Sequence, residues 1–133
     1  MTMQARGTFE VKLNPLPAHA AAPDAKLGRM SIDKQFQGDL DGTSQGEMLS
    51  AMTDVKGSAG YVAIERVSAT LNGRRGTFVL QHNATMNRGE PFLNIIVVPD
   101  SGSGELAGLS GSMRIIIADG RHSYEFDYTL APA

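Results

Sequence analysis

Polar and apolar residues alternate along most of the chain, which is the pattern of half-buried β-strands. The clearest case is Thr8–Leu13, where Phe9, Val11 and Leu13 share one face. The pattern predicts eight strands in all, over Thr8–Leu13, Arg29–Leu40, Thr43–Ala51, Tyr61–Leu71, Gly76–Met86, Phe92–Val98, Ser112–Ala118 and Arg121–Leu130. Eight short strands are enough to close a small antiparallel barrel.

Three dipeptides favour tight hairpin turns between these strands: Asp41-Gly42, Asn72-Gly73 and Asp119-Gly120. An Asp or Asn followed by Gly suits the two positive-φ positions of a type I′ turn. The sequence therefore predicts an all-β antiparallel fold in a single domain over residues 1–133.

Three segments are less regular. Tyr61–Leu71 also fits helical spacing, but its β-branched residues and the turn that follows favour a strand. Leu16–Ala25 is rich in Pro and Ala and is expected to form an exposed loop. Gly104–Gly111 is expected to form a turn or a short helical piece.

A two-residue turn fixes which side chains share a face. At Asn72-Gly73 it places Ala63 opposite His82 and Glu65 opposite Leu80, so Tyr61, Glu65 and His82 face the interior. At Asp41-Gly42 it pairs Leu40 with Thr43 and Phe36 with Glu47, which places Gln45 and Glu47 inside. At Asp119-Gly120 it pairs Ile115 with Tyr124 and directs Arg114 and Glu125 outward as an ion pair.

Charge and composition narrow the function classes. The 133 residues include 12 Lys and Arg against 14 Asp and Glu, a net charge of −2, which argues against nucleic-acid binding through bulk positive charge. Cysteine is absent, and no apolar run approaches the roughly 20 residues of a membrane helix. Met1–Lys12 lacks the apolar segment of a signal peptide. We expect a soluble cytoplasmic protein without nucleic-acid or membrane partners.

A few polar groups converge on the otherwise apolar inner face, as in a small-ligand pocket. The candidate catalytic residues are Glu65, His82 and Glu47, because a carboxylate and an imidazole can act as acid and base. The candidate ligand-binding residues are Gln45, Tyr61, Phe78, Leu80, Met86 and Tyr124. The alternative is that these are hydrogen-bonded or packed interior groups without a ligand.

The environment of Glu65 predicts how its carboxyl group titrates. If Glu65 lies among Val67, Phe78 and Leu80 without a cationic partner, burial raises its pKa. Arg66 is not expected to be that partner, since adjacent strand residues point to opposite faces.

No metal or cofactor is expected. The three histidines, His19, His82 and His122, lie on separate segments, and no His-Glu-x-x-His motif is present. The Gly-rich stretches lack the phosphate-binding pattern with Lys followed by Ser or Thr.

Four segments resemble the DUF3224 family of uncharacterised bacterial proteins: 42–50 (GTSQGEMLS), 57–67 (GSAGYVAIERV), 80–89 (LQHNATMNRG) and 98–111 (VPDSGSGELAGLSG). The resemblance covers nearly the whole chain and implies an eight-stranded antiparallel barrel similar to that of allene oxide cyclase. It implies no reaction, because fold does not determine function.

Three functions stay open. The first is binding of a small apolar or amphipathic molecule inside the barrel. The second is an isomerase or cyclase that uses a buried Glu with His82. The third is a structural or interaction protein whose interior is filled. An open cavity at Glu65 would favour the first two, and an interior packed by phenylalanines would favour the third.

The strand Phe92–Val98 is apolar on both faces, although a barrel strand needs only one apolar face. Ile116 is also expected to face outward, beside Arg114. Because monomers rarely expose extended apolar patches, we expect a homo-oligomer, most simply a two-fold dimer, through the outer face of these strands.

Overall fold

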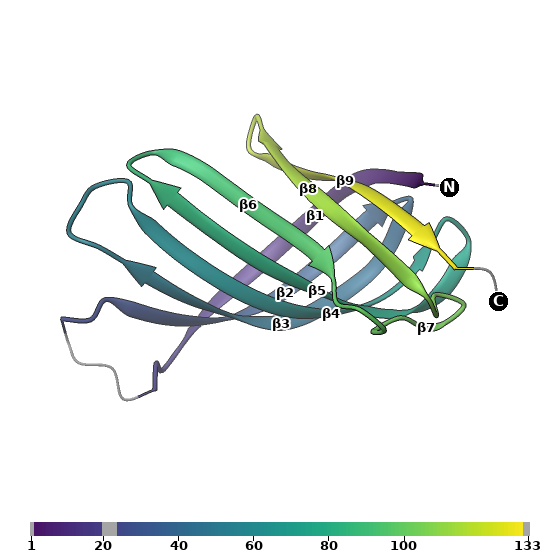
Figure 1. Cartoon of the computed structure of the whole chain (residues 1–133), viewed down its shortest axis with the longest axis horizontal. Coiled ribbons are helices and arrows are strands. Elements are labelled where there is room, and N and C mark those ends of the chain that lie inside the picture. The colour runs from purple at the N-terminus through teal and green to yellow at the C-terminus, as the bar shows by residue number, and fades with distance from the viewer. Residues whose placement is uncertain (1, 20–23, 132–133) are drawn as a thin grey trace.

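The computed structural model describes residues 2–19 and 24–131 (Figure 1). These residues contain nine strands and no helix: β1 (Met3–Leu16), β2 (Leu27–Gly38), β3 (Leu40–Met52), β4 (Ala59–Leu71), β5 (Arg74–Asn87), β6 (Glu90–Val97), β7 (Ser103–Gly104), β8 (Leu109–Ala118) and β9 (Arg121–Leu130). Eight strands form a closed antiparallel ring in the order β4-β3-β2-β1-β9-β8-β6-β5, and β5 pairs back to β4. The two-residue β7 adds to β5. The predicted eight-stranded antiparallel barrel is confirmed.

The structure shows the conformation of the three less regular segments wherever it describes them. Tyr61–Leu71 lies within β4 and is a strand. In Gly104–Gly111 the predicted turn is confirmed: residues 105–108 connect β7 to β8 as a turn, with the Leu106 amide donating to the Ser103 carbonyl oxygen at 3.1 Å, and no helix forms there. The predicted Leu16–Ala25 loop falls partly on residues 20–23, which are outside the described residues, and Leu16 itself ends β1.

Two of the three predicted hairpins have the predicted register. Leu71 pairs with Arg74, which places Ala63 opposite His82. Ile115 pairs with Tyr124 across the other turn. Asn72 and Asp119, each followed by glycine, have positive φ angles of 46° and 54°, as a type I′ turn requires.

The predicted turn at Asp41-Gly42 is wrong. Both residues lie in β3, Gly42 pairs with Phe36, and the chain reverses around Gly38 instead, where φ is +107°. Gly42 is needed for close approach of strands rather than for a turn. A Cβ atom there would lie 2.6 Å from the Cβ of Ala69 and would overlap the carbonyl oxygen of Ser68 on β4.

This one displacement reverses the faces of β3. Ser44 points inward and is 1% exposed, whereas Gln45 and Glu47 lie exposed on the outer face. The interior positions predicted for Gln45 and Glu47 are therefore wrong: Phe36 pairs with Gly42 instead of Glu47, a register shift of five residues, and a shift by an odd number of residues sends every side chain of the strand to the other face.

The β2–β3 corner is held by a side chain from a distant strand. The Tyr124 hydroxyl of β9 accepts a hydrogen bond from the Leu40 amide at 2.9 Å. It lies 2.9 Å from the Gln37 carbonyl oxygen and 3.0 Å from that of Leu40, to which it can donate. The corner's polar backbone groups are thus satisfied without water.

The end of the barrel beside this corner is filled. It lies at the right in Figure 1, with both termini, the β4–β5 turn and β7. The rings of Phe78 and Phe126 stack at 5.9 Å, and Phe36 meets the edge of Tyr124 at 5.7 Å. Leu106, from the connection between β7 and β8, is fully buried against this cluster.

The ring is weakest between β6 and β8. These strands pair at one position, Ile96 with Ser112, whereas neighbouring strands pair over many residues. Beyond that pair, toward the left end in Figure 1, β8 and β6 diverge. Ile117 of β8 and Leu93 of β6 are exposed there, although the alternation along each strand places both on the interior face.

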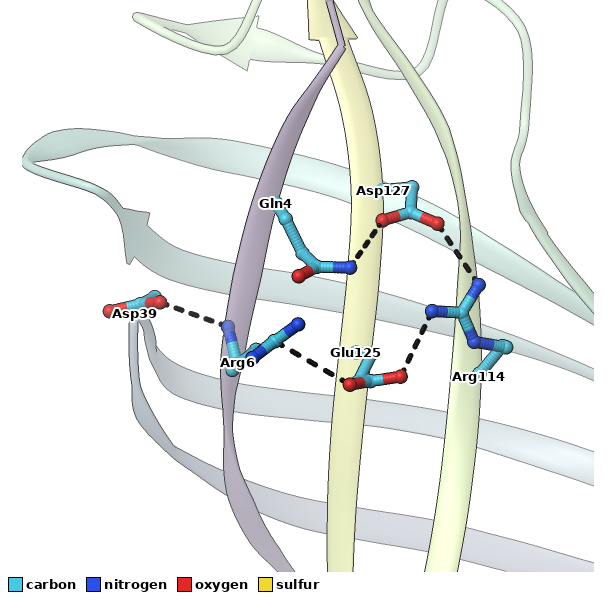
Figure 2. Close-up of polar contacts among 6 residues, drawn as sticks. All are labelled: Gln4, Arg6, Asp39, Arg114, Glu125 and Asp127. Atoms are coloured by element: carbon cyan, nitrogen blue, oxygen red, sulfur yellow. Dashed lines mark hydrogen bonds and ion pairs between the residues drawn. The ribbon is translucent and has the colours of Figure 1, made fainter.

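A network of exposed charges joins β1, β9 and β8 on the outer surface (Figure 2). Arg114 donates hydrogen bonds to Glu125 at 2.9 Å and to Asp127 at 3.0 Å. Gln4 donates to Asp127, and Arg6 lies 3.5 Å from Glu125. The predicted outward pair of Arg114 with Glu125 is confirmed. Hydrogen bonds to the two carboxylates raise the pKa of Arg114.

Replacing Tyr124 with Phe tests the corner contact. The substitution leaves the Leu40 amide without its partner, and an unsatisfied buried donor costs about 1–3 kcal/mol in the free energy of unfolding. Urea denaturation measures the loss. The matched control is Tyr61→Phe, whose hydroxyl has no hydrogen bond to any described residue and whose removal should change stability by less than about 0.5 kcal/mol. Equal effects of the two substitutions would contradict the assignment.

Candidate functional site

Glu65 is a fully buried carboxylate surrounded by three donor side chains. Its Oε2 accepts a hydrogen bond from Lys34 Nζ at 2.9 Å and lies 2.5 Å from His82 Nε2. Its Oε1 accepts a hydrogen bond from Ser44 Oγ at 2.7 Å. The group is an ion pair extended by a hydroxyl and an imidazole.

Four neighbouring strands supply these side chains, and their register explains the contacts. Lys34 pairs with Ser44 across β2 and β3, and Glu65 and His82 are diagonal neighbours on β4 and β5. Gly46 lies directly opposite Glu65 and brings no side chain. The Glu65 carboxylate therefore has room to reach Ser44 and Lys34.

The pKa of Glu65 is lowered to about 2. Burial by itself raises the pKa, but the hydrogen bonds and charges of His82 and Lys34 together outweigh it. The sequence predicted a raised pKa for Glu65 only if Glu65 had no cationic partner, and Lys34 is such a partner. Glu65 is therefore ionised at neutral pH and cannot donate a proton there.

Lys34 is itself held in an aromatic setting. Its Nζ lies 5.0 Å from the ring centre of Phe9 and 5.7 Å from that of Phe36. Ring faces attract a cation, and the attraction strengthens where water is excluded. The paired charges of Lys34 and Glu65 cancel, so the buried network carries no net charge while the His82 ring is neutral.

A cavity of about 200 Å³ lies above this network, at the end opposite the filled core. Every strand of the ring contributes to its wall, through Phe9, Val11, Leu13, Ile32, Lys34, Met48, Tyr61, Ala63, His82, Leu93, Ile115, Ile117 and His122. The wall is mainly apolar, with Lys34, Tyr61 and the two histidines as its polar members. The interior is thus filled at one end and hollow at the other.

The cavity is small for a ligand site. An engineered cavity of about 150 Å³ encloses benzene, whereas sites for drug-sized ligands measure roughly 300–1,000 Å³. Two grooves of about 440 Å³ on the barrel wall are larger. Those grooves are lined largely by exposed side chains such as Gln45 and Leu49, and each reaches part of the network, Lys34 and Ser44 in one and His82 in the other. The interior cavity is the space that both Lys34 and His82 line and to which every strand of the ring contributes.

The structure brings three of the predicted site residues together. Glu65, His82 and Tyr61 all face the interior, and the Tyr61 and His82 rings lie 6.4 Å apart between centres. Burial, and then the negative charge of Glu65, raises the pKa of Tyr61. Its hydroxyl therefore keeps its proton at neutral pH.

The other predicted residues lie elsewhere. Phe78 and Leu80 face inward but are fully buried in the core below the cavity. Met86 is 41% exposed near the end of β5, and the Tyr124 hydroxyl is engaged by the corner backbone. Glu47, on the outer face, forms an ion pair with Arg29.

Lys34 and Ser44 were not among the predicted site residues. Lys34 has the same parity as Ile32 and Phe36, so alternation alone could have placed it inside. The turn predicted at Asp41-Gly42 placed Gln45 on the interior face and Ser44 on the outer face, which is the reverse of their positions in the structure. No local feature signals that either residue binds Glu65.

In residues 2–19 and 24–131 the structure contains no group of three or more side chains placed to hold a metal ion. The same residues include no helix that is long and apolar enough to cross a membrane.

Comparisons with known proteins agree with this architecture. The family model "Protein of unknown function (DUF3224)" matches residues 5–128. A crystal structure of a protein with unknown function from the DUF3224 family of Shewanella oneidensis MR-1 is 54% identical, with a TM-score of 0.95 and full coverage of both chains. No curated protein matches the chain.

The lowered pKa of Glu65 predicts a stability change in acid. The unfolded chain binds a proton near the ordinary value of 4.5, and the folded chain only near 2. The stabilisation from Glu65 is thus complete above about pH 4.5 and is lost as the pH falls through 2. We expect Glu65 to contribute about 3 kcal/mol to the pH dependence of unfolding between these values.

Urea denaturation at pH steps from 6 to 2 measures this contribution. The double variant Lys34→Met/Glu65→Gln removes both buried charges without stranding one, and it should flatten the pH dependence relative to the unmodified protein. Glu47→Gln, on the outer face, is the control and should leave the profile unchanged. A double variant as acid-sensitive as the unmodified protein would rule out the assignment.

Proposed function

Since the chain belongs to the DUF3224 family of proteins of unknown function, we propose a function from its own geometry: the barrel binds a small amphipathic molecule in the cavity at its open end. The observation that carries this proposal is the position of the Lys34–Glu65–His82 network at the floor of an apolar cavity. Charges buried in a pair usually stabilise a fold no better than well-packed apolar residues of the same size. A ligand site gives such a network a use that packing does not.

The shape of the cavity supports an apolar ligand body with one polar end. Ile32, Leu93, Ile115 and Ile117 offer apolar contact along the wall. His82 and Tyr61 offer polar atoms near the floor. The filled core of Phe36, Phe78 and Phe126 fits the structural alternative for the lower half of the barrel, so only the upper half is assigned to a ligand.

A second candidate is proton transfer on a bound molecule, as in an isomerase or cyclase. The 2.5 Å contact between His82 and Glu65 favours it, because a carboxylate that orients an imidazole is a common acid–base arrangement. In this version His82 exchanges the proton and Glu65 positions it. Glu47 has no part, since it lies outside the barrel.

We propose two further features, one from the fold and one from the composition. The ring of eight antiparallel strands supports an architecture of the allene oxide cyclase type. The cysteine-free composition supports a cytoplasmic location, where disulfides are rare.

Filling the cavity tests the binding function. Ala63→Leu replaces a methyl by an isobutyl group in the cavity wall, while Val62→Leu makes a smaller change, one added methylene, on the outer face one residue away. Native mass spectrometry of the freshly purified proteins looks for a bound small molecule, and NMR titration with toluene measures the affinity of the cavity. We expect Ala63→Leu to weaken binding at least tenfold and Val62→Leu to leave it unchanged. Equal binding by both variants would refute the site.

We also propose that the protein forms a homo-oligomer, most simply a dimer, through the outer face of β6 and its neighbours. Ile96 pairs with Gln81, and Gln81 pairs with Ile64, so these side chains form one outer row across β6, β5 and β4. Ile64, Val62 and Phe92 are at least half exposed. A second copy is the occupant that would cover this row with a matching apolar surface.

Ile96→Lys should give monomers, because a charge placed in this row must lose its water when two copies meet. Analytical ultracentrifugation at high micromolar concentration measures the state. Lys12→Ala, on the outer face of β1, is the control. An unmodified protein that sediments as a 14.2 kDa monomer would refute the proposal.

A further inference from the structure

The two ring nitrogens of His82 have different surroundings. Nε2 lies 2.5 Å from Glu65 Oε2. Glu65 is ionised, so its oxygens only accept hydrogen bonds, and Lys34 and Ser44 also donate to it. A neutral His82 ring that bonds to this carboxylate must therefore carry its proton on Nε2 and leave Nδ1 as an acceptor.

His82 lines both the interior cavity and the outer groove that includes Glu47 and Leu49, and we assign its Nδ1 to the cavity because the side chain faces the barrel interior. No described side chain or backbone group forms a hydrogen bond with Nδ1. In the described part of the chain no buried side-chain nitrogen or oxygen lacks a partner, so Nδ1 is not sealed inside the protein. The His82 side chain faces the barrel interior and is part of the cavity wall.

The two charged side chains of the network, Lys34 and Glu65, neutralise each other. Lys34 is paired with Glu65, so an anionic ligand would find no unpaired cation in the network. A carboxylate ligand would also bring acceptor oxygens toward an acceptor nitrogen. A cationic ligand would find Glu65 covered by three donors. Within the network, the polar feature still available to a ligand is the acceptor Nδ1 of a neutral His82 ring, and the Tyr61 hydroxyl in the same wall can add a second hydrogen bond.

We propose that the cavity selects a neutral molecule with one hydroxyl or N–H donor on an apolar body about the size of a phenol, and that His82 Nδ1 accepts that donor. The inference rests on the proposed binding function and names its ligand class. The cavity volume sets the size of the body, and the Glu65 contact sets the polarity of the recognition atom. Recognition thus depends on a carboxylate that never touches the ligand.

The proton position on His82 can be measured without any ligand. Nitrogen-15 NMR of histidine-labelled protein at pH 8, where free imidazole is neutral, distinguishes protonated from unprotonated ring nitrogens. We expect a protonated Nε2 and an unprotonated Nδ1. The reverse assignment would overturn the inference and leave the cavity itself in place.

Ligand selectivity gives the second test. Phenol, anisole and toluene share an aromatic body, and only phenol carries a donor. We expect phenol to bind about five- to tenfold more tightly than anisole, as one added hydrogen bond allows. His82→Phe should abolish that preference and keep toluene binding, whereas His19→Phe, at an exposed histidine outside the cavity wall, should keep the preference.

The outcomes separate the two proposals. Anisole and toluene that bind as tightly as phenol would overturn the role of His82 and leave the binding function standing. Failure of all three probes to bind would overturn the binding function, and the ligand class with it. If His82→Phe does not fold, the comparison of phenol with anisole on the unmodified protein decides the question.

Discussion

The buried carboxylate of Glu65 is the constraint around which the open half of the barrel is arranged. An ionised carboxylate without partners would be far too costly in an apolar interior. Three donors from β2, β3 and β5 remove that cost, and each requires its own strand to be in register with β4. The network therefore ties the positions of four adjacent strands to one another at the level where the packed core gives way to the cavity.

The two ends of the barrel differ in the contacts that join their strands. At the filled end, Tyr124 crosses the interior to bond the β2–β3 corner, and Leu106 closes the core. At the open end, β6 and β8 share a single paired position and then diverge. The Tyr124 contacts and the buried Leu106 thus belong to the filled end, and the cavity lies at the end where β6 and β8 diverge.

The positive charge of Lys34 is compensated inside the protein. Its ammonium group is paired with the Glu65 carboxylate and lies near the rings of Phe9 and Phe36. The network presents the His82 ring to the cavity, oriented by its contact with Glu65. Under the proposed binding function, this arrangement and the mainly apolar wall favour weakly polar ligands over ions.

Much of the fold follows from local chemistry. Alternation placed the eight strands, and the Asn72-Gly73 and Asp119-Gly120 turns fixed two registers, because a two-residue type I′ turn leaves one pairing. That was sufficient to bring Tyr61, Glu65 and His82 to one interior face. It was also sufficient to place Arg114 beside Glu125 on the outside.

The tertiary structure decided the rest. Asp41-Gly42 has the composition of a turn, but Gly42 lies in a strand because Ala69 and Ser68 of β4 approach too closely for any side chain. That contact joins residues distant in sequence, so no local pattern reports it, and it moved Ser44 inside and Gln45 and Glu47 outside. Parity alone could place Lys34 in the interior. Its pairing with Glu65 depends on the β2–β3 and β3–β4 registers together. Burial alone would raise the pKa of Glu65, and the hydrogen bond with His82 together with the ion pair with Lys34 lowers it instead.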